Sequence, residues 1–192
     1  SNILREIRFI RYRKWNEIRL LYGGIPMNGL KLMVDTTMFD ENVKLNLIVY
    51  KTDNEQTYFV QEYSYICETI ISVISTILNK ITLFDVKEVV INKLGFGISI
   101  GEELERESIK NIKYLTPDKV SLSDARLRLH NGLSTNIIFD EKFGCIVEEG
   151  HSIVDYLKCV RLDVFGGIVI PKSENVNDER EYKQLANCLI GD

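Results

Sequence analysis

The sequence predicts an α+β fold, in which one long amphipathic helix over about residues 63–80 packs on an antiparallel or mixed sheet and a C-terminal helix follows. Three observations lead to this prediction. Apolar and polar residues alternate over much of 30–62, which is typical of strands with one buried face. Apolar residues then recur at three- and four-residue steps over 63–81, which is typical of a helix. The same helical period returns near the C-terminus, at Tyr182, Leu185 and Leu189.

The composition is that of an ordinary globular protein. The chain has 192 residues, of which 45% are hydrophobic and 27% charged, so it can form a core without disulfides or a metal. We expect one globular domain over 1–192. The charged run at 102–107 makes 101–118 the place for a boundary if the chain forms two lobes.

Charge and cysteine usage restrict the class of protein. The net charge of −4 argues against a protein that coats DNA or membranes in general. The sequence has no apolar run of the roughly 18 residues that a membrane-spanning helix needs, and it starts with no secretory signal pattern. The four cysteines are scattered without a CxxC pair, as in reduced proteins. These observations favour a cytoplasmic protein that does not contact a membrane.

The first elements are predicted as follows. Residues 5–22 carry both helical and alternating patterns, and we favour a helix ended by Gly23 and Gly24. Strands are expected at 30–34 and 43–49, with a turn at 52–55 and a third strand over 57–62.

After the long helix, strands are expected at 87–92 and 96–100, with Gly95 and Gly97 serving tight turns or close packing. The alternation at 126–130 followed by Asn131-Gly132 predicts a hairpin.

The remaining elements are shorter. A second hairpin is expected between 137–139 and 145–147, a short helix over 153–160, and a last strand over 167–170. The C-terminal helix should end at Gly191.

The acidic residues suggest one function. A cluster of four carboxylates can steer and hold a basic protein. With no catalytic motif in view, we favour a non-catalytic protein-binding module, most concretely an inhibitor of the toxin-immunity kind. It would bind a basic toxin or enzyme without a cofactor. Its partner-binding residues would be Glu102, Glu103, Glu105 and Glu107.

The N-terminus suggests the first alternative, a nucleic-acid-binding protein. Residues 1–19 hold six Lys or Arg against two Glu, with Phe9, Tyr12 and Trp15 between them. Guanidinium groups pair with phosphates and aromatic rings stack on bases. The contact residues would be Arg8, Arg11, Arg13 and Lys14.

A metal-dependent nuclease is a second form of that alternative. Pro117-Asp118 and Asp140-Glu141-Lys142 resemble the motif of the restriction-endonuclease-like superfamily. The resemblance implies that Asp118, Asp140 and Lys142 are the catalytic residues of a site that binds a divalent metal and activates water. The pattern is short, however, and 85–87 and 181–183 also fit it. The histidines and cysteines match no zinc spacing, so no Cys/His metal site is predicted.

Overall fold

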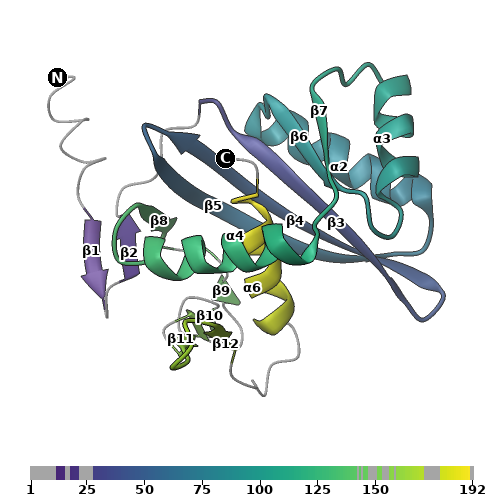
Figure 1. The fold of residues 1–192 in the computed structure, drawn as a ribbon. Helices are drawn as coiled ribbons and strands as arrows, with labels where there is room; N and C mark the ends of the chain where they lie inside the picture. The colour runs from purple at the N-terminus through teal and green to yellow at the C-terminus, as the bar shows by residue number, and fades with distance from the viewer. Residues whose placement is uncertain are drawn as a thin grey trace, which may run out of the picture. The chain divides into compact units, whose positions relative to one another are not determined.

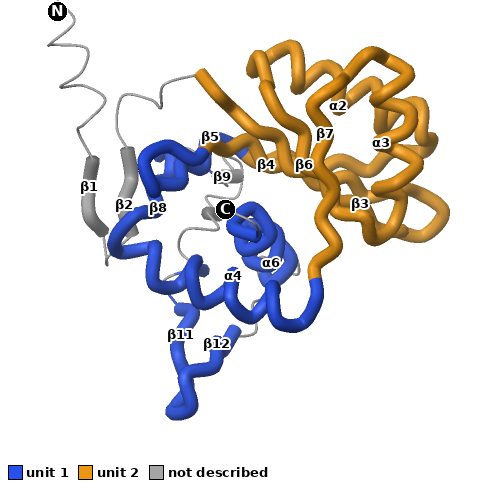
Figure 2. The backbone as a smooth tube through the Cα atoms, turned by 45° about the horizontal axis from the view of Figure 1, so that its top comes forward, with its two compact units in different colours: residues 1–26, 52–61, 118–192 blue, residues 27–51, 62–117 orange. Residues whose placement is uncertain are grey.

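The computed structural model describes residues 12–15, 18–21, 28–141, 143, 145–146, 151–152, 156–157, 159–170 and 178–190. The fold is of the α+β class with a mixed sheet, as predicted (Figure 1). The chain forms two compact units, each made of separate segments (Figure 2). Unit 1 comprises 1–26, 52–61 and 118–192, and unit 2 comprises 27–51 and 62–117. Among the described residues, no helix has the length and apolar character needed to cross a membrane.

The sheet of unit 2 is built around β3. This strand (Lys31–Phe39) pairs antiparallel with β4 (Asn42–Asp53) on one side and parallel with β6 (Glu88–Asn92) on the other. β7 (Ile112–Leu115) extends the sheet parallel to β6, and β5 (Gln56–Cys67) lies beyond β4. The apolar alternation is the reason for this arrangement, since Leu32, Val34 and Leu47 are almost fully buried.

Two helices belong to unit 2. α2 (Ile70–Phe84) buries Val73, Ile74 and Ile77, and it packs against α3 (Gly97–Arg106). α3 lies on the sheet face that carries the side chains of Ile91 and Tyr114. The approach is so close that a Cβ on Gly97 or Gly101 would collide with atoms at the ends of β6 and β7.

The predicted long helix begins later than expected. β5 continues to Cys67, and the helix starts only after Thr69. Thr69 and Ser72 form a reciprocal capping box, in which the Thr69 hydroxyl accepts the Ser72 N–H at 3.1 Å. Residues 63–67 fit both the two-residue period of a strand and the helical period. The capping box fixes the helix start after Thr69, so these residues continue β5.

The strand predicted at 96–100 is wrong, because these residues begin α3. Gly97 allows the helix to start directly against the last carbonyl of β6: a Cβ there would lie 2.0 Å from the Asn92 oxygen. Gly97 therefore packs closely on the end of β6, at the start of a helix and not within the predicted strand.

Unit 1 contains α4 (Lys119–Gly132), which packs against α6 (Asp178–Asn187). β8 (Ile137–Asp140) pairs parallel with β5 and with β2 (Ile18–Leu21). Phe59, Phe139 and Phe143 form its aromatic core, with ring centroids 5.2 to 5.8 Å apart.

Three further sequence predictions for unit 1 are wrong. β1 (Tyr12–Trp15) and β2 form an antiparallel hairpin in place of a helix over 5–22. The segment 126–132, expected as a hairpin, is the end of α4, in which Ala125, Leu129 and Gly132 are buried at helical spacing. β8 does not pair with β9 (Cys145–Ile146), which pairs instead with β10 (His151–Ser152).

The short strand predicted at 167–170 is present as β12 (Ile168–Val169), paired with β11 (Arg161–Leu162). The helix predicted over 153–160 lies partly outside the described residues. Among the residues of this range that are described, 156–157 are helical. Cys67 and Cys188 are buried, and Cys159 is exposed.

Candidate active site

A single acidic residue lies in the middle of the central strand of unit 2. Asp35 follows Val34 and precedes Thr36, both nearly fully buried, and its own side chain is half-buried. Charged side chains are uncommon among the buried residues of a strand, so Asp35 is a candidate functional residue.

Two asparagines flank Asp35 on the neighbouring strands. Asn46 of β4 is its cross-strand partner, and Asn92 of β6 follows the paired residues Val34 and Ile91, so Asn92 stands beside Asp35. Both amides are only 5% exposed. Paired residues of adjacent strands share one face, which the ion pair between Lys31 and Glu88 at 3.9 Å shows directly for β3 and β6.

A basic residue continues the same face. Lys44 pairs with Thr37, two residues along from the Asp35–Asn46 pair, and both side chains are half-buried. Side chains on a strand alternate between faces, so the face that carries Asp35 also carries Lys44. We call Asp35, Lys44, Asn46 and Asn92 the Asp35 cluster. It lies on the face of the sheet opposite α3.

The loop after β6 is held firmly beside the cluster. The Asn92 side-chain oxygen accepts the Leu94 N–H at 3.0 Å, and the Thr36 hydroxyl accepts the Phe96 N–H at 3.1 Å. Gly95 has φ +69°, and a Cβ there would lie 2.6 Å from the Thr36 carbonyl oxygen. These contacts fix the backbone between β6 and α3 against β3, and they explain why Gly95 is needed.

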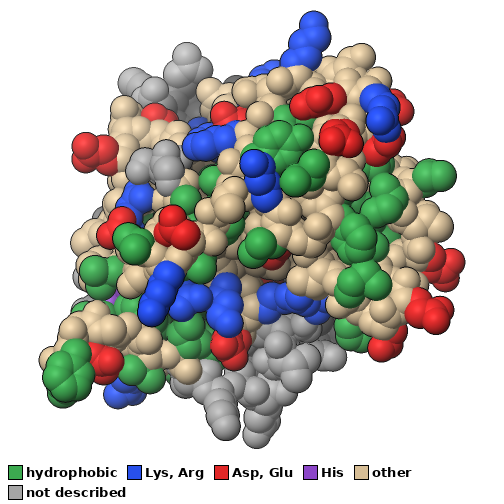
Figure 3. Space-filling model, turned by 45° about the vertical axis from the view of Figure 1, so that its right-hand side comes forward, with side chains coloured by type: hydrophobic (Ala, Val, Ile, Leu, Met, Phe, Trp, Pro, Cys, Tyr) green, Lys and Arg blue, Asp and Glu red, His purple; other side chains and the backbone are tan. Residues whose placement is uncertain are grey.

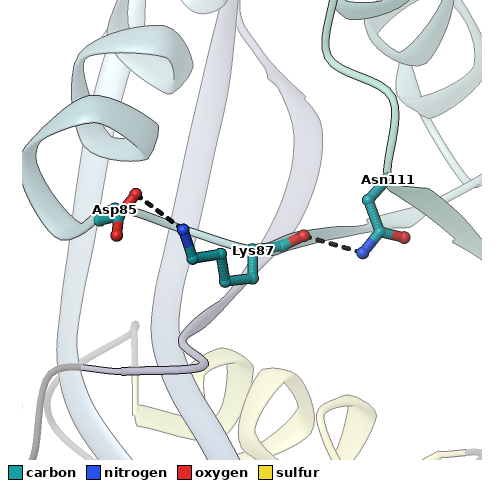
Figure 4. Close-up of polar contacts among 3 residues, drawn as sticks. All are labelled: Asp85, Lys87 and Asn111. Carbon is teal, nitrogen blue, oxygen red and sulfur yellow. Dashed lines mark hydrogen bonds and ion pairs between the residues drawn. The ribbon is translucent and has the colours of Figure 1, made fainter.

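The other end of β6 is fixed as well. Lys87 forms an ion pair with Asp85 at 3.1 Å, and its backbone carbonyl accepts the Asn111 side-chain N–H at 2.8 Å (Figure 4). The ion pair is exposed and contributes little, but the amide contact ties the start of β6 to the start of β7. Asn92 therefore sits on a strand anchored at both ends.

The nuclease residues suggested by the sequence are not members of the Asp35 cluster. Asp118 is the N-cap of α4 and accepts the Ser121 N–H at 2.7 Å, and these hydrogen bonds with Ser121 lower the pKa of its carboxyl. Asp140 is the half-buried last residue of β8. Lys142 lies outside the described residues. Asp118 thus has a structural role as a helix cap.

The acidic and basic clusters from the sequence are placed as follows. Glu102, Glu105 and Glu107 are exposed on or just after α3, and Glu103 forms an ion pair with Arg106. The burial of Tyr114 and the charges of Glu105 and Glu102 raise the pKa of its hydroxyl. Arg13 and Lys14 belong to β1, while Arg8 and Arg11 lie outside the described residues.

Asp35 is not among the site residues predicted from the sequence. Its signal was available, because Asp35 is the one charged residue within the run from Leu32 to Phe39, just where the apolar alternation ends. The predicted strand ends at Val34, one residue before Asp35. Its pairing with Asn46 and its position beside Asn92 depend on strands that are distant in sequence.

Among the described residues, no three His, Cys, Asp or Glu side chains come together in a metal-binding group. The Asp35 cluster offers the Asp35 carboxylate and the Asn46 amide oxygen, while the Asn92 oxygen accepts the Leu94 N–H. Mg²⁺ commonly keeps several waters and binds through only one or two carboxylates together with substrate phosphates, so this donor set fits one hard divalent cation.

The fold is similar to that of solved viral nucleases. The nuclease domain of the large terminase of bacteriophage SPP1, with bound Mn, superposes with a TM-score of 0.54 at 12% identity, over 88% of this chain and 94% of that one. The large terminase nuclease of the thermophilic phage G20c, with bound magnesium, gives a TM-score of 0.52 at 14% identity over 94% and 91%. The large terminase of the thermophilic bacteriophage D6E gives 0.54 at 15% identity, over 87% of this chain and 42% of the terminase.

No family model matches the sequence, and no curated protein matches it. The structural likeness nevertheless overturns the main functional prediction. The interpretation as an inhibitor or toxin-immunity protein is wrong, because the fold is similar to that of large terminase nuclease domains. The nucleic-acid alternative agrees better with this fold.

Proposed function

We propose that this chain is a divalent-metal-dependent nuclease domain of the large terminase type, with Asp35 as its metal-binding carboxylate. The observation that carries the proposal is the position of Asp35 on the central strand, between the buried amides Asn46 and Asn92. The fold likeness supports it, since the structures of similar fold from phages SPP1 and G20c hold Mn and magnesium.

Each residue of the cluster has a role that follows from its chemistry. Asp35 would hold the cation, with the Asn46 and Asn92 amides near it on the adjacent strands. When bound, the cation supplies Lewis-acid stabilisation of charge on a phosphoryl oxygen. Lys44, on the same face, would attract a phosphate of the nucleic-acid backbone as a point charge.

Asn92 is a positioning residue. Its side-chain oxygen accepts the Leu94 N–H, so it shapes the loop that leads into α3. This contact keeps the loop against β3, where the Thr36 hydroxyl holds Phe96. A site supported in this way stays in one geometry, which positioning of a reacting phosphate requires.

The test is a cleavage assay on supercoiled and linear double-stranded DNA, and on RNA, with Mn²⁺ or Mg²⁺ and with EDTA. We expect cleavage that requires the cation. Asp35→Asn should lower its rate by about 100-fold or more, because metal stabilisation of the transition state is worth several kcal/mol.

Asp40→Asn is the matched control. Asp40 is an exposed acid in the turn between β3 and β4, with φ +53°, a conformation that Asn also tolerates. The Asp40→Asn variant should cleave nucleic acid at the same rate as the unaltered chain. Metal-independent cleavage, or equal activity in both variants, would contradict the proposal, and circular dichroism shows whether each variant is folded.

A further inference from the structure

The hairpin formed by β11 and β12 presents an apolar tip to solvent. Val164 is 93% exposed and Phe165 is 94% exposed, more than any other large hydrophobic residue among those described. Figure 2 shows the ribbon and its turn projecting from the rest of unit 1. Other hydrophobic side chains also reach the surface (Figure 3), but at this tip two adjacent large apolar side chains are almost fully exposed.

The tip is held in one conformation by hydrogen bonds. A carboxylate oxygen of Asp163 accepts the N–H groups of Phe165 and Gly167, each at 2.8 Å. The Asp163 N–H donates to the Gly167 carbonyl at 2.8 Å, and Gly166, with φ +81°, donates to the Asp163 carbonyl at 3.1 Å. A turn ordered in this way loses little conformational entropy when it binds.

Exposed basic side chains lie at the base of the ribbon and on the helix beside it. β12 contacts α4, and a pocket of about 290 Å³ between them is lined by Ile168 and by residues of α4 that include Lys119 and Arg126. Lys119 is exposed, as is Arg161 at the base of the ribbon. Three carboxylates belong to the same elements: Asp118, the N-cap beside Lys119, Asp124 on α4, and Asp163, which accepts the two hydrogen bonds above.

We propose that this ribbon is a DNA wedge, which inserts the Phe165 ring between stacked base pairs of double-stranded DNA while Arg161 and Lys119 contact the adjacent phosphates. The proposal rests on the proposed nuclease function, which supplies the nucleic acid. Apolar side chains of this kind partly unstack a base step and kink the duplex from the minor groove. The tip would thereby fix the position and bend of the DNA that the protein cleaves.

The size of the apolar tip favours DNA over a protein partner. A stable protein interface buries about 800 Å² on each partner, and a tip of two residues on a narrow ribbon offers far less. A single ring between two bases, by contrast, is a complete contact, since stacking on one base contributes a measurable share of affinity.

The test uses a duplex with 2-aminopurine at successive positions, bound in EDTA so that no cleavage occurs. The unaltered protein should raise 2-aminopurine fluorescence at one position, which reports an unstacked base. The Val164→Ser, Phe165→Ser double variant should abolish this rise and weaken binding about 10-fold. The single variant Phe165→Trp, in contrast, should keep both the fluorescence rise and the affinity, because the indole ring also stacks on bases.

Ile71→Ser, Leu83→Ser is the matched control. These residues of α2 are 81% and 63% exposed, and their loss should leave fluorescence and affinity unchanged. Affinity and fluorescence that are unaffected by the tip variant would overturn the wedge while leaving the nuclease proposal intact. A protein that neither binds nor cleaves DNA would overturn both. A tip variant that changes only self-association in sedimentation would show a protein contact in place of the wedge.

Discussion

Asp35 and Asn46 are cross-strand partners, and the side-chain nitrogen of Asn46 is buried without a hydrogen-bond partner among the described residues. Partners in such a pair have Cβ atoms about 4.5–5.5 Å apart. An unsatisfied buried N–H costs about 1–3 kcal/mol, so native proteins rarely keep one without a reason. A phosphate oxygen or a hydration water of a cation beside Asp35 would satisfy it.

The first prediction concerns this pair. Asn46→Asp places a second buried carboxylate opposite Asp35, and we expect it to lower the unfolding free energy at pH 7 by about 1–3 kcal/mol. The folded-state pKa of the new carboxyl is raised above its unfolded value, so the loss is present above that pKa and disappears as the pH falls below the unfolded value near 4.

Thermal melts at pH 7 and pH 4, with and without Mn²⁺, provide the measurement. Mn²⁺ should recover part of the lost stability in Asn46→Asp, because it binds between two carboxylates, and should not do so in Asn46→Ala. The contradicting result is a difference in melting temperature between Asn46→Asp and the unaltered chain that is the same at both pH values. It would show that the side chains at positions 35 and 46 do not face one another.

The second prediction concerns Lys44. Lys44→Gln should weaken DNA binding about 3- to 10-fold and reduce the slope of log affinity against log salt by about one, as measured by fluorescence anisotropy over a salt series. Lys87→Gln serves as the control, because Lys87 is an exposed lysine already paired with Asp85. Identical slopes for the two variants would show that Lys44 does not contact a phosphate.

The third prediction compares two glycines of α3. Gly97→Ala should destabilise the protein by about 1–3 kcal/mol, because its Cβ would lie 2.0 Å from the backbone oxygen of Asn92. Gly101→Ala should cost less, since the atoms it meets are the hydroxyl and the adjacent ring edge of the Tyr114 side chain, which can move, and not the backbone. Chemical denaturation measures both, and the reverse order would contradict the packing of α3 on the end of β6.

The fourth prediction concerns the cap of α4. Asp118→Ala should lower the melting temperature at pH 7, because Asp118 accepts the Ser121 N–H. The pKa of the Asp118 carboxyl is lowered in the folded protein. Its stabilisation is therefore present above the unfolded pKa near 4 and is lost as the pH falls through the lower folded value.

Asp124→Ala, on the same helix and exposed, serves as the comparison. The difference in melting temperature between the two variants should shrink below about pH 4. A difference that persists at pH 2.5 would mean that Asp118 acts through something other than its ionised carboxylate.

The sequence predicts the fold class because its strongest signals are local. The alternation around Leu45 and the helical period around Ile74 each describe one element and its buried face. Both elements are present, and the strand at 88–92 also agrees. Local patterns fail where two periods overlap, as at 63–67, where the cap formed by Thr69 and Ser72 moves the helix start.

The candidate site is harder to predict, because it is assembled by pairing between distant strands. Asp35, Asn46 and Asn92 lie on three strands, and only the register places them together. The Asp118 and Asp140 pattern, by contrast, is a short motif that chance supplies, and a helix cap accounts for Asp118. An isolated acid inside an apolar strand would have been the better guide to the site.

The central claim is that Asp35 binds a divalent cation, and electron paramagnetic resonance of Mn²⁺ tests it most directly. Free Mn²⁺ gives a sharp signal that broadens on binding, so a titration counts the bound ions without requiring cleavage. We predict that the unaltered protein and Asp40→Asn bind Mn²⁺ equally, and that Asp35→Asn loses that binding while remaining folded. Unchanged Mn²⁺ binding in Asp35→Asn, or none in the unaltered protein, would contradict the assignment.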